Sequence, residues 1–230
     1  SEHRDFSGTV HFIFQPAEEN EAGGRAMVQA GLFNLFPCDA VYGMHNAPGL
    51  AFGHFATRPG PMMACSDLFE IVITGKGAHA AHPQNSRDPV LASAQVVAAL
   101  QGIVSRNVSA TDALVLSITQ INGGDTWNVI PETVMLRGTC RSFAAAVQDR
   151  AEARMRAICA GIAEASETSI SLNYRHHYPA VVNTPAQTAT LARAATRLVG
   201  AERVDTNCAL RMGSEDFAFL LQACPGAYAI

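Results

Sequence analysis

Residues 12–24 read FIFQPAEENEAGG, an apolar run that ends in two adjacent carboxylates, Glu18 and Glu19. Residues 8–14 alternate and are rich in β-branched and aromatic side chains, which predicts a strand in front of this pair. Neighbouring side chains in an extended or loop segment point in different directions. One glutamate can therefore bind a metal ion while the other removes a proton from water on that metal. The alternative interpretation is a solvated acidic turn after a strand.

The segment around this pair alternates between strand and helix. A helix is predicted over 22–30 with Gly31 as its stop, and short strands are predicted over 40–46 and 51–57. Such alternation indicates an α/β layer structure. Residues 58–63, RPGPMM, then combine proline and glycine in a break that is typical of a domain boundary.

The elements predicted after this break follow the order β-α-β-β-α-β. The strands are expected at 68–75, 113–121, 133–143 and 168–174, and the helices at 89–104 and 146–166. This order is that of the ferredoxin-like unit, a four-stranded antiparallel sheet with two helices on one face. Such a unit is small enough to be inserted into another domain. Residues 62–175 are therefore expected to interrupt an α/β domain formed by residues 1–61 and 176–230.

His45 ends the strand predicted over 40–46, much as Glu19 follows the strand predicted over 8–14. In open α/β sheets, binding sites form at the carboxyl ends of strands. Carboxylate and imidazole ligands suit Zn²⁺ or Mn²⁺. Glu19 and His45 are candidate metal ligands on this ground, although their spacing alone favours an ordinary core or surface histidine.

Two further candidates lie in loops of the predicted insertion. His79, in GKGAHAAHP, is placed to donate a hydrogen bond to a developing oxyanion. A water-facing loop histidine is the alternative, and a metal pair with His82 is disfavoured because the segment has no helical pattern. Asn128, in GGDTWNVIP, carries an amide that can bind a substrate carboxylate or carbonyl. Its alternative is an ordinary turn residue.

Residues 213–217, GSEDF, have the pattern of a helix start. Ser214 would be the N-cap, and the two acids would lie in the first turn. The functional alternative is that these acids support a metal cleft, and the structural interpretation is favoured here.

The amino-acid composition argues against several classes of protein. The 230 residues are 48% hydrophobic and 16% charged, with a formal net charge of −4, which argues against nucleic acid or an acidic membrane surface as a partner. Six cysteines are scattered without a CxxC pair, which favours a reduced cytoplasmic protein with buried thiols. No apolar run reaches about 18 residues, so no transmembrane helix is predicted.

Taken in order, FQPAEEN, GMHN, GKGAHAAHP, NVIP and GSEDF closely resemble the metal-dependent amidohydrolases that include hippurate hydrolases, N-acyl-amino-acid amidohydrolases and auxin-conjugate hydrolases. The resemblance covers essentially the whole chain. It implies a catalytic α/β domain of the zinc-peptidase type, built from residues 1–61 and 176–230. It also implies that residues 62–175 form an inserted ferredoxin-like lid, which in this family commonly mediates dimerisation.

The same resemblance implies roles for individual residues. Glu18 matches the general base, and Glu19 and His45 match ligands of a pair of divalent metal ions (Zn²⁺, Mn²⁺, Ni²⁺ or Co²⁺) bridged by water. His79 matches the lid histidine that polarises the scissile carbonyl, often from the partner subunit, and Asn128 matches a lid residue that contacts substrate. The implied reaction is hydrolysis of an N-acyl amino acid, such as hippurate, to a carboxylic acid and an amino acid.

The chain also departs from the family pattern. The upstream Asp-rich motif, the Cys-Gly-His segment and the last metal-binding histidine of the family are absent, so Glu19 and His45 are its only two expected ligands. The chain starts without Met and stops within a predicted strand, so we expect an internal piece of a longer polypeptide. Two hypotheses follow: a hydrolase represented in part and inactive alone, or a truncated, non-catalytic module that dimerises or binds a ligand. Gln84, after the lid proline, and the bulky Trp127 are expected to alter substrate contacts.

Overall fold

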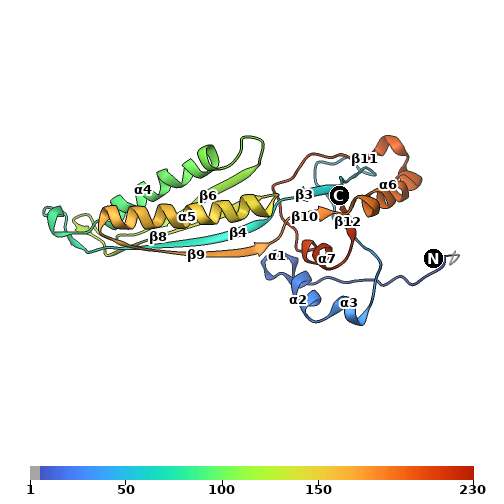
Figure 1. Ribbon diagram of the computed structural model, residues 1–230, viewed down its shortest axis with the longest axis horizontal. Coiled ribbons are helices and arrows are strands. Elements are labelled where there is room, and N and C mark those ends of the chain that lie inside the picture. The colour runs from blue at the N-terminus through green and yellow to red at the C-terminus, as the bar shows by residue number, and fades with distance from the viewer. Residues whose placement is uncertain (1–5) are drawn as a thin grey trace.

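The structure is a computed structural model, and it describes residues 6–230. Figure 1 shows an elongated molecule with two halves. One half is a sheet carrying two long helices, and the other contains shorter elements and both ends of the described segment, residues 6–230. Among residues 6–230, every helix is too short or too polar to span a lipid bilayer.

The first half is a four-stranded antiparallel sheet with strand order β6-β8-β4-β9. Its main elements, in chain order, are β4 (Ser66–Thr74), α4 (Pro89–Gly102), β6 (Leu114–Asn122), β8 (Thr133–Ser142), α5 (Ala145–Ser166) and β9 (Ser169–Tyr178). Their order is the one predicted from the sequence. The expected boundary after residue 175 falls inside β9, and the three-segment division stays a prediction.

Both helices cover the same face of this sheet (Figure 1). Alternate residues of β4, such as Ile71 and Ile73, point toward the helices and are fully buried. Leu100 of α4 and Met155 of α5 pack against them in one apolar core. Each fully buried side chain of this size contributes about 1.5–3 kcal/mol to stability, which makes this core the principal support of the half.

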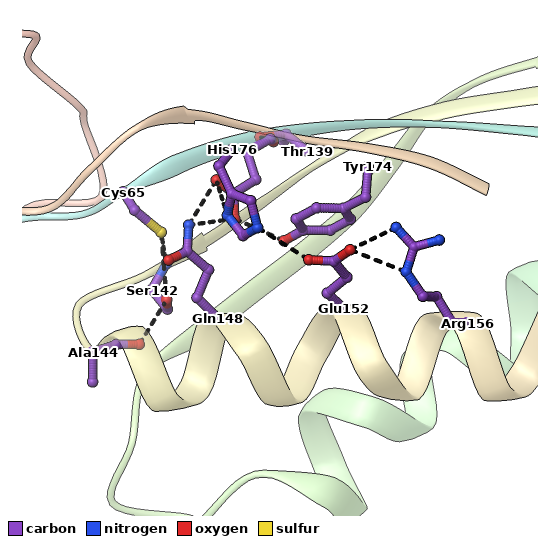
Figure 2. A network of polar contacts seen from close by, with 10 residues as sticks. Cys65, Thr139, Ser142, Ala144, Gln148, Glu152, Arg156, Tyr174 and His176 are labelled. Carbon is purple, nitrogen blue, oxygen red and sulfur yellow. Dashed lines mark hydrogen bonds and ion pairs between the residues drawn. The ribbon is translucent and has the colours of Figure 1, made fainter.

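A buried polar network fastens α5 to the sheet. Asp67, at the start of β4, is fully buried. Its carboxylate accepts two hydrogen bonds of 2.8 Å from Gln148 Nε2 and one of 2.7 Å from the Tyr174 hydroxyl. Figure 2 shows Gln148 reaching up from α5 beside Tyr174 of β9. A buried carboxylate needs such donors, so the network fixes the helix in one position on the sheet.

The far end of this half carries short elements. These are β5 (Ala78–His79), η1 (Pro83–Asn85) and β7 (Val129–Ile130), whereas η2 (Ile103–Asn107) follows α4 at the opposite end, near the start of β6. β5 pairs antiparallel with β7. The two loops that contain His79 and Asn128 therefore meet at this end.

The second half contains three two-stranded pairings: β1 with β12 and β2 with β11, both parallel, and β3 with β10, antiparallel. Its strands are β1 (Val41–Met44), β2 (Phe55–Ala56), β3 (Gly60–Met63), β10 (Val181–Asn183), β11 (Val204–Asp205) and β12 (Gly226–Ala229). Its helices are α1 (Glu18–Glu21), α2 (Gly23–Gln29), α3 (Leu32–Leu35), α6 (Pro185–Val199), η3 (Ala201–Arg203) and α7 (Ala218–Ala223). Met62, Val181 and Leu220 are fully buried in its core. Parallel and antiparallel pairs packed with helices give the α/β architecture expected.

The strand predicted over 8–14 is not observed. Residues 9–17 are in neither a helix nor a strand, and Phe12 and Phe14 are 82% and 88% exposed. Within residues 6–230, β1 pairs with β12 and with no other strand. A cavity of about 840 Å³ is lined by residues 9–13 on one side and 37–44 on the other. An alternating sequence becomes a strand only where a partner satisfies its backbone groups, and here the neighbouring strand lies across a gap.

The helix predicted to begin at Ser214 is also wrong. α7 begins at Ala218, and Phe217, not Ser214, precedes it. Glu215 and Asp216 are buried and accept hydrogen bonds from Tyr228 and Gly24, residues distant in the sequence. These tertiary contacts replace the helix start that the local sequence favours.

Candidate functional site

A cavity of about 460 Å³ lies where the two halves meet. Glu18, Glu19 and His45 all line it. The structure therefore brings together three of the five predicted site residues, from segments that are separate in the sequence.

The backbone around Glu18 is pinned to the end of β9. The Tyr178 hydroxyl donates a hydrogen bond to the Glu18 carbonyl oxygen and accepts one of 3.2 Å from the Ala22 backbone N–H. Both contacts involve backbone atoms, so they hold the loop, and Glu18 lines the cavity.

His45 is placed by the parallel pair β1 and β12. Its backbone N–H donates to the Ala229 carbonyl at 3.1 Å, which continues the ladder one residue beyond β1. The side chain thus emerges at the carboxyl end of the strand, as the sequence predicts. Gly43 makes this possible, because a Cβ there would lie 2.9 Å from the rings of Phe217 and Tyr228.

A cluster of carboxylates lies beside the cavity. Oxygens of Glu18, Glu215 and Asp216 lie within 4.8 Å of one another. Burial is the main cause that raises the pKa of Glu18, and the charges of Glu215, Glu19 and Asp216 add to it. Burial likewise raises the pKa of Asp216. Carboxylate oxygens and an imidazole around one cavity are the donor set that divalent metal ions take, so the residues present fit such an ion.

Arginine and histidine side chains that line this cavity were not predicted. Arg141, His177 and Arg211 line the same cavity. The Arg141 guanidinium donates a 2.8 Å hydrogen bond to the Met212 carbonyl, which ties β8 to the loop that carries Glu215. In the sequence, Arg141 is one alternating residue of a strand and gives no signal of its own.

His177 reaches the cavity through a β-bulge. Ser66 pairs with Tyr178 and Asp67 pairs with His176, so His177 is the extra residue between them. Bulges next to binding sites commonly redirect a side chain in this way. Burial, followed by the charges of two nearby arginines, lowers the pKa of His177. The adjacent histidines of the HHY sequence, His176 and His177, were the available signal.

His79 and Asn128 are not at this cavity. They lie together, since the Ala80 N–H donates to the Asn128 carbonyl at 2.9 Å, and both side chains are exposed. Ser66, at one end of β4, lines the cavity, and the loop to His79 leaves from Thr74 at the other end. Eight residue steps of about 3.3 Å place these ends about 26 Å apart. Figure 1 shows the loops after β4 at the far tip.

Comparison with known proteins agrees with the motifs. Residues 1–230 match the family model described as Peptidase family M20/M25/M40. N-acetylcysteine deacetylase of Bacillus subtilis is 40% identical over 97% of this chain and 58% of its own length. Hippurate hydrolase of Campylobacter jejuni is 34% identical over 98% of this chain and 59% of its own length.

A solved structure is similar as well. The crystal structure of a Bacillus subtilis protein, described as a dinuclear metal-binding peptidase from the M20 family, superposes with a TM-score of 0.76 and 33% identity. The match covers 94% of this chain and 53% of that one. The chain thus spans between half and three-fifths of the length of these relatives. By the family model over its whole length, and by these identities, the chain belongs to Peptidase family M20/M25/M40.

Proposed function

We propose that this chain forms part of a metal-dependent amidohydrolase that cleaves the amide bond of N-acyl amino acids, giving a carboxylic acid and an amino acid. The observation that carries the proposal is the single cavity lined by Glu18, Glu19 and His45. The names of two relatives, N-acetylcysteine deacetylase and hippurate hydrolase, support an acyl group on the nitrogen of an amino acid.

In this proposal, Glu19 and His45 hold metal, and the complete enzyme uses two divalent ions of Zn²⁺, Mn²⁺, Ni²⁺ or Co²⁺. A bound ion of this kind brings the pKa of its water close to neutrality. Glu18 is the general base that takes the proton and later gives it to the leaving amine. A pKa of Glu18 above that of an ordinary carboxylate suits both transfers, because a base is most effective near the working pH.

We further propose that the four-stranded half is a ferredoxin-like lid and that two copies of the protein dimerise through it. The same chain's His79 cannot reach its own cavity across about 26 Å of β4. A second copy would supply His79 as a hydrogen-bond donor to the oxyanion and Asn128 as a contact for the substrate. The net charge of −4 supports no nucleic-acid or membrane partner. Five of the six cysteines are buried and all six are free, which suits a reducing compartment such as the cytoplasm.

The alternative is a non-catalytic module that dimerises or binds a ligand. It is motivated by the ligand set that the motifs predict, because the two residues Glu19 and His45 are too few to hold a pair of ions tightly.

The decisive experiment compares wild type with Glu18→Gln. Intact mass, bound metal and hydrolysis of hippurate and N-acetyl amino acids are measured on one preparation. Glu18→Gln is expected to lose turnover by about 10²–10⁴-fold, the contribution of a positioned base, while it keeps its metal. Glu21→Gln is the matched control, since Glu21 is exposed on the same short helix and does not line the cavity.

Two outcomes would contradict the proposal. Equal turnover in Glu18→Gln and wild type would remove Glu18 from the mechanism. A wild-type chain of 24.4 kDa with neither metal nor turnover would favour the non-catalytic alternative.

A further inference from the structure

The loop that carries Glu18 and Glu19 has little local structure to fix its shape. Its helix, α1, is four residues long and has no side-chain cap at its N-terminus. Ala17 and Ala22, which flank the helix, have φ values of 50° and 53°, in the left-handed region. Residues other than glycine keep this conformation only where surrounding contacts hold them. The placement of the two glutamates therefore depends on contacts from outside the loop.

Asp216 makes such contacts at both ends of the loop. Its side chain is fully buried, and Oδ2 accepts a 2.6 Å hydrogen bond from the Gly24 N–H while Oδ1 accepts one from Gln15 Nε2. Gly24 allows this approach, because a Cβ there would lie 2.9 Å from the Asp216 carbonyl oxygen. The Asp216 carboxylate thus joins Gln15, which precedes the two glutamates, to α2, which follows them.

Asp216 is in turn attached to the strands that carry His45. Its neighbour Glu215 is 5% exposed and accepts a 2.7 Å hydrogen bond from the Tyr228 hydroxyl. Tyr228 belongs to β12 and pairs in register with Gly43 of β1, two residues before His45. The adjacent acids therefore connect the glutamate loop to the framework of the histidine.

We propose that Asp216 is a positioning residue that holds Glu18 and Glu19 at the cavity in fixed relation to His45. The inference rests on the proposed function, in which these three residues are the base and two metal ligands. Asp216 does not line the cavity, and its two carboxylate oxygens accept from Gly24 and Gln15, so we assign it to the loop. Its oxygens also lie within 4.8 Å of those of Glu18 and Glu215, and exchange at Gly24 in metal-free protein separates the positioning role from direct binding of an ion. A carboxylate suits the position because both partners present N–H donors, and an ionised carboxylate only accepts.

The test exchanges donor and acceptor across the contact between Asp216 and Gln15. In Asp216→Asn, the new NH₂ group faces another donor, so one of the two hydrogen bonds is lost. In the double variant Asp216→Asn, Gln15→Glu, the new carboxylate accepts from the new amide, and the Gly24 N–H keeps its acceptor. Zn²⁺ affinity is measured on the whole chain by competition with a chromogenic chelator. Hydrogen exchange at the Gly24 amide is measured on metal-free protein.

Asp216→Asn is expected to weaken Zn²⁺ binding by about 10- to 100-fold, as is typical when a partner of the ligands is changed, and to speed exchange at Gly24. The double variant is expected to recover Gly24 exchange, and Zn²⁺ affinity only in part, because position 15 also lies beside Glu215, whose Oε1 is 3.4 Å from Gln15 Nε2 in wild type. Gln15→Ala, which leaves the buried acid in place, should give a smaller loss of the same kind. Asp67→Asn is the matched control: it alters an equally buried carboxylate in the four-stranded sheet and should lower thermal stability without weakening Zn²⁺ binding.

If Asp216→Asn binds Zn²⁺ as tightly as wild type and its Gly24 amide exchanges at the wild-type rate, the inference is overturned. The proposed function is not affected by that result. Failure of the double variant to recover Gly24 exchange would also overturn the inference. A wild-type chain that binds no Zn²⁺ would overturn the proposed function, and exchange at Gly24 would still decide whether Asp216 holds the loop. If Asp216→Asn does not fold, Gln15→Ala decides by the same two measurements.

Discussion

At the scale of single residues, His177 gives the molecule a sensitivity to acid. Its ordinary pKa of 6.5 is lowered in the folded protein, first by burial and then by Arg25 and Arg175. The unfolded chain therefore binds a proton at a pH where the folded chain does not. The contribution of His177 to the free energy of unfolding is fully present above pH 6.5, the pKa of the unfolded chain. It is lost as the pH falls from there through the lower pKa of the folded protein.

We expect His177→Gln to reduce this loss of stability below pH 6.5, because glutamine cannot be protonated there. Urea unfolding at a series of pH values measures the effect. His82→Gln, a change to an exposed histidine in a loop, is the control. It should leave the dependence of the free energy of unfolding on pH as it is in wild type. A slope in His177→Gln equal to that of wild type would assign the acid sensitivity to other groups.

Individual site residues were predictable only where a motif carried them. Glu18, Glu19 and His45 follow predicted strands in recognisable sequence, and the structure places all three at one cavity. Asn183, which does not line the cavity, was also not predicted, although its buried amide donates to the carbonyls of Arg58 and Tyr228 at 3.0 Å and accepts from the Tyr228 N–H at 2.8 Å. Such a role depends on which distant strands become neighbours, and neither composition nor spacing contains that information.

At the scale of elements, α4 has the best-defined start of any helix described between residues 6 and 230. Asp88 Oδ1 accepts hydrogen bonds from the N–H groups of Val90 at 2.8 Å and Leu91 at 3.1 Å, and Pro89 occupies the first turn. Asp88→Ala is expected to lower the free energy of unfolding by about 1 kcal/mol, the usual contribution of an N-cap. Urea unfolding measures it, with the exposed Asp112→Ala as control. A loss no larger than that of the control would contradict this role.

Elements were predictable where the local pattern and the tertiary partners agree. β4 and β8 alternate in sequence and lie inside a sheet with a neighbour on each side, so pattern and structure coincide. Residues 8–14 have the same kind of pattern but lack a paired strand, and Phe12 and Phe14 remain exposed. The helix start at Ser214 failed for the opposite reason, because long-range hydrogen bonds to the two acids overrode local preference.

At the scale of the whole molecule, a shared site makes a specific prediction about mixtures. Glu18→Gln and His79→Ala are each expected to be inactive alone. If two copies share their sites, a mixed dimer contains one site in which both residues are intact, and an equimolar mixture recovers about a quarter of wild-type activity for a symmetric dimer. Hippurate hydrolysis after mixing and re-equilibration measures it. Mixing Glu18→Gln with Glu19→Gln is the control and should recover nothing, since both changes fall in the same half.

The two strands that connect the halves of the molecule lie next to each other. The chain leaves the half that contains Glu18 and His45 through β3 and returns through β10, where Met63 and Val181 are paired. The whole four-stranded unit therefore begins and ends at one point in space, and segments with neighbouring ends tolerate insertion and exchange. A different sheet could therefore be grafted between Met63 and Val181 to change the surface that faces Glu18 and Glu19 across the cavity. Such a graft would need to restore one contact above all, the Tyr178 hydroxyl that holds the Glu18 carbonyl.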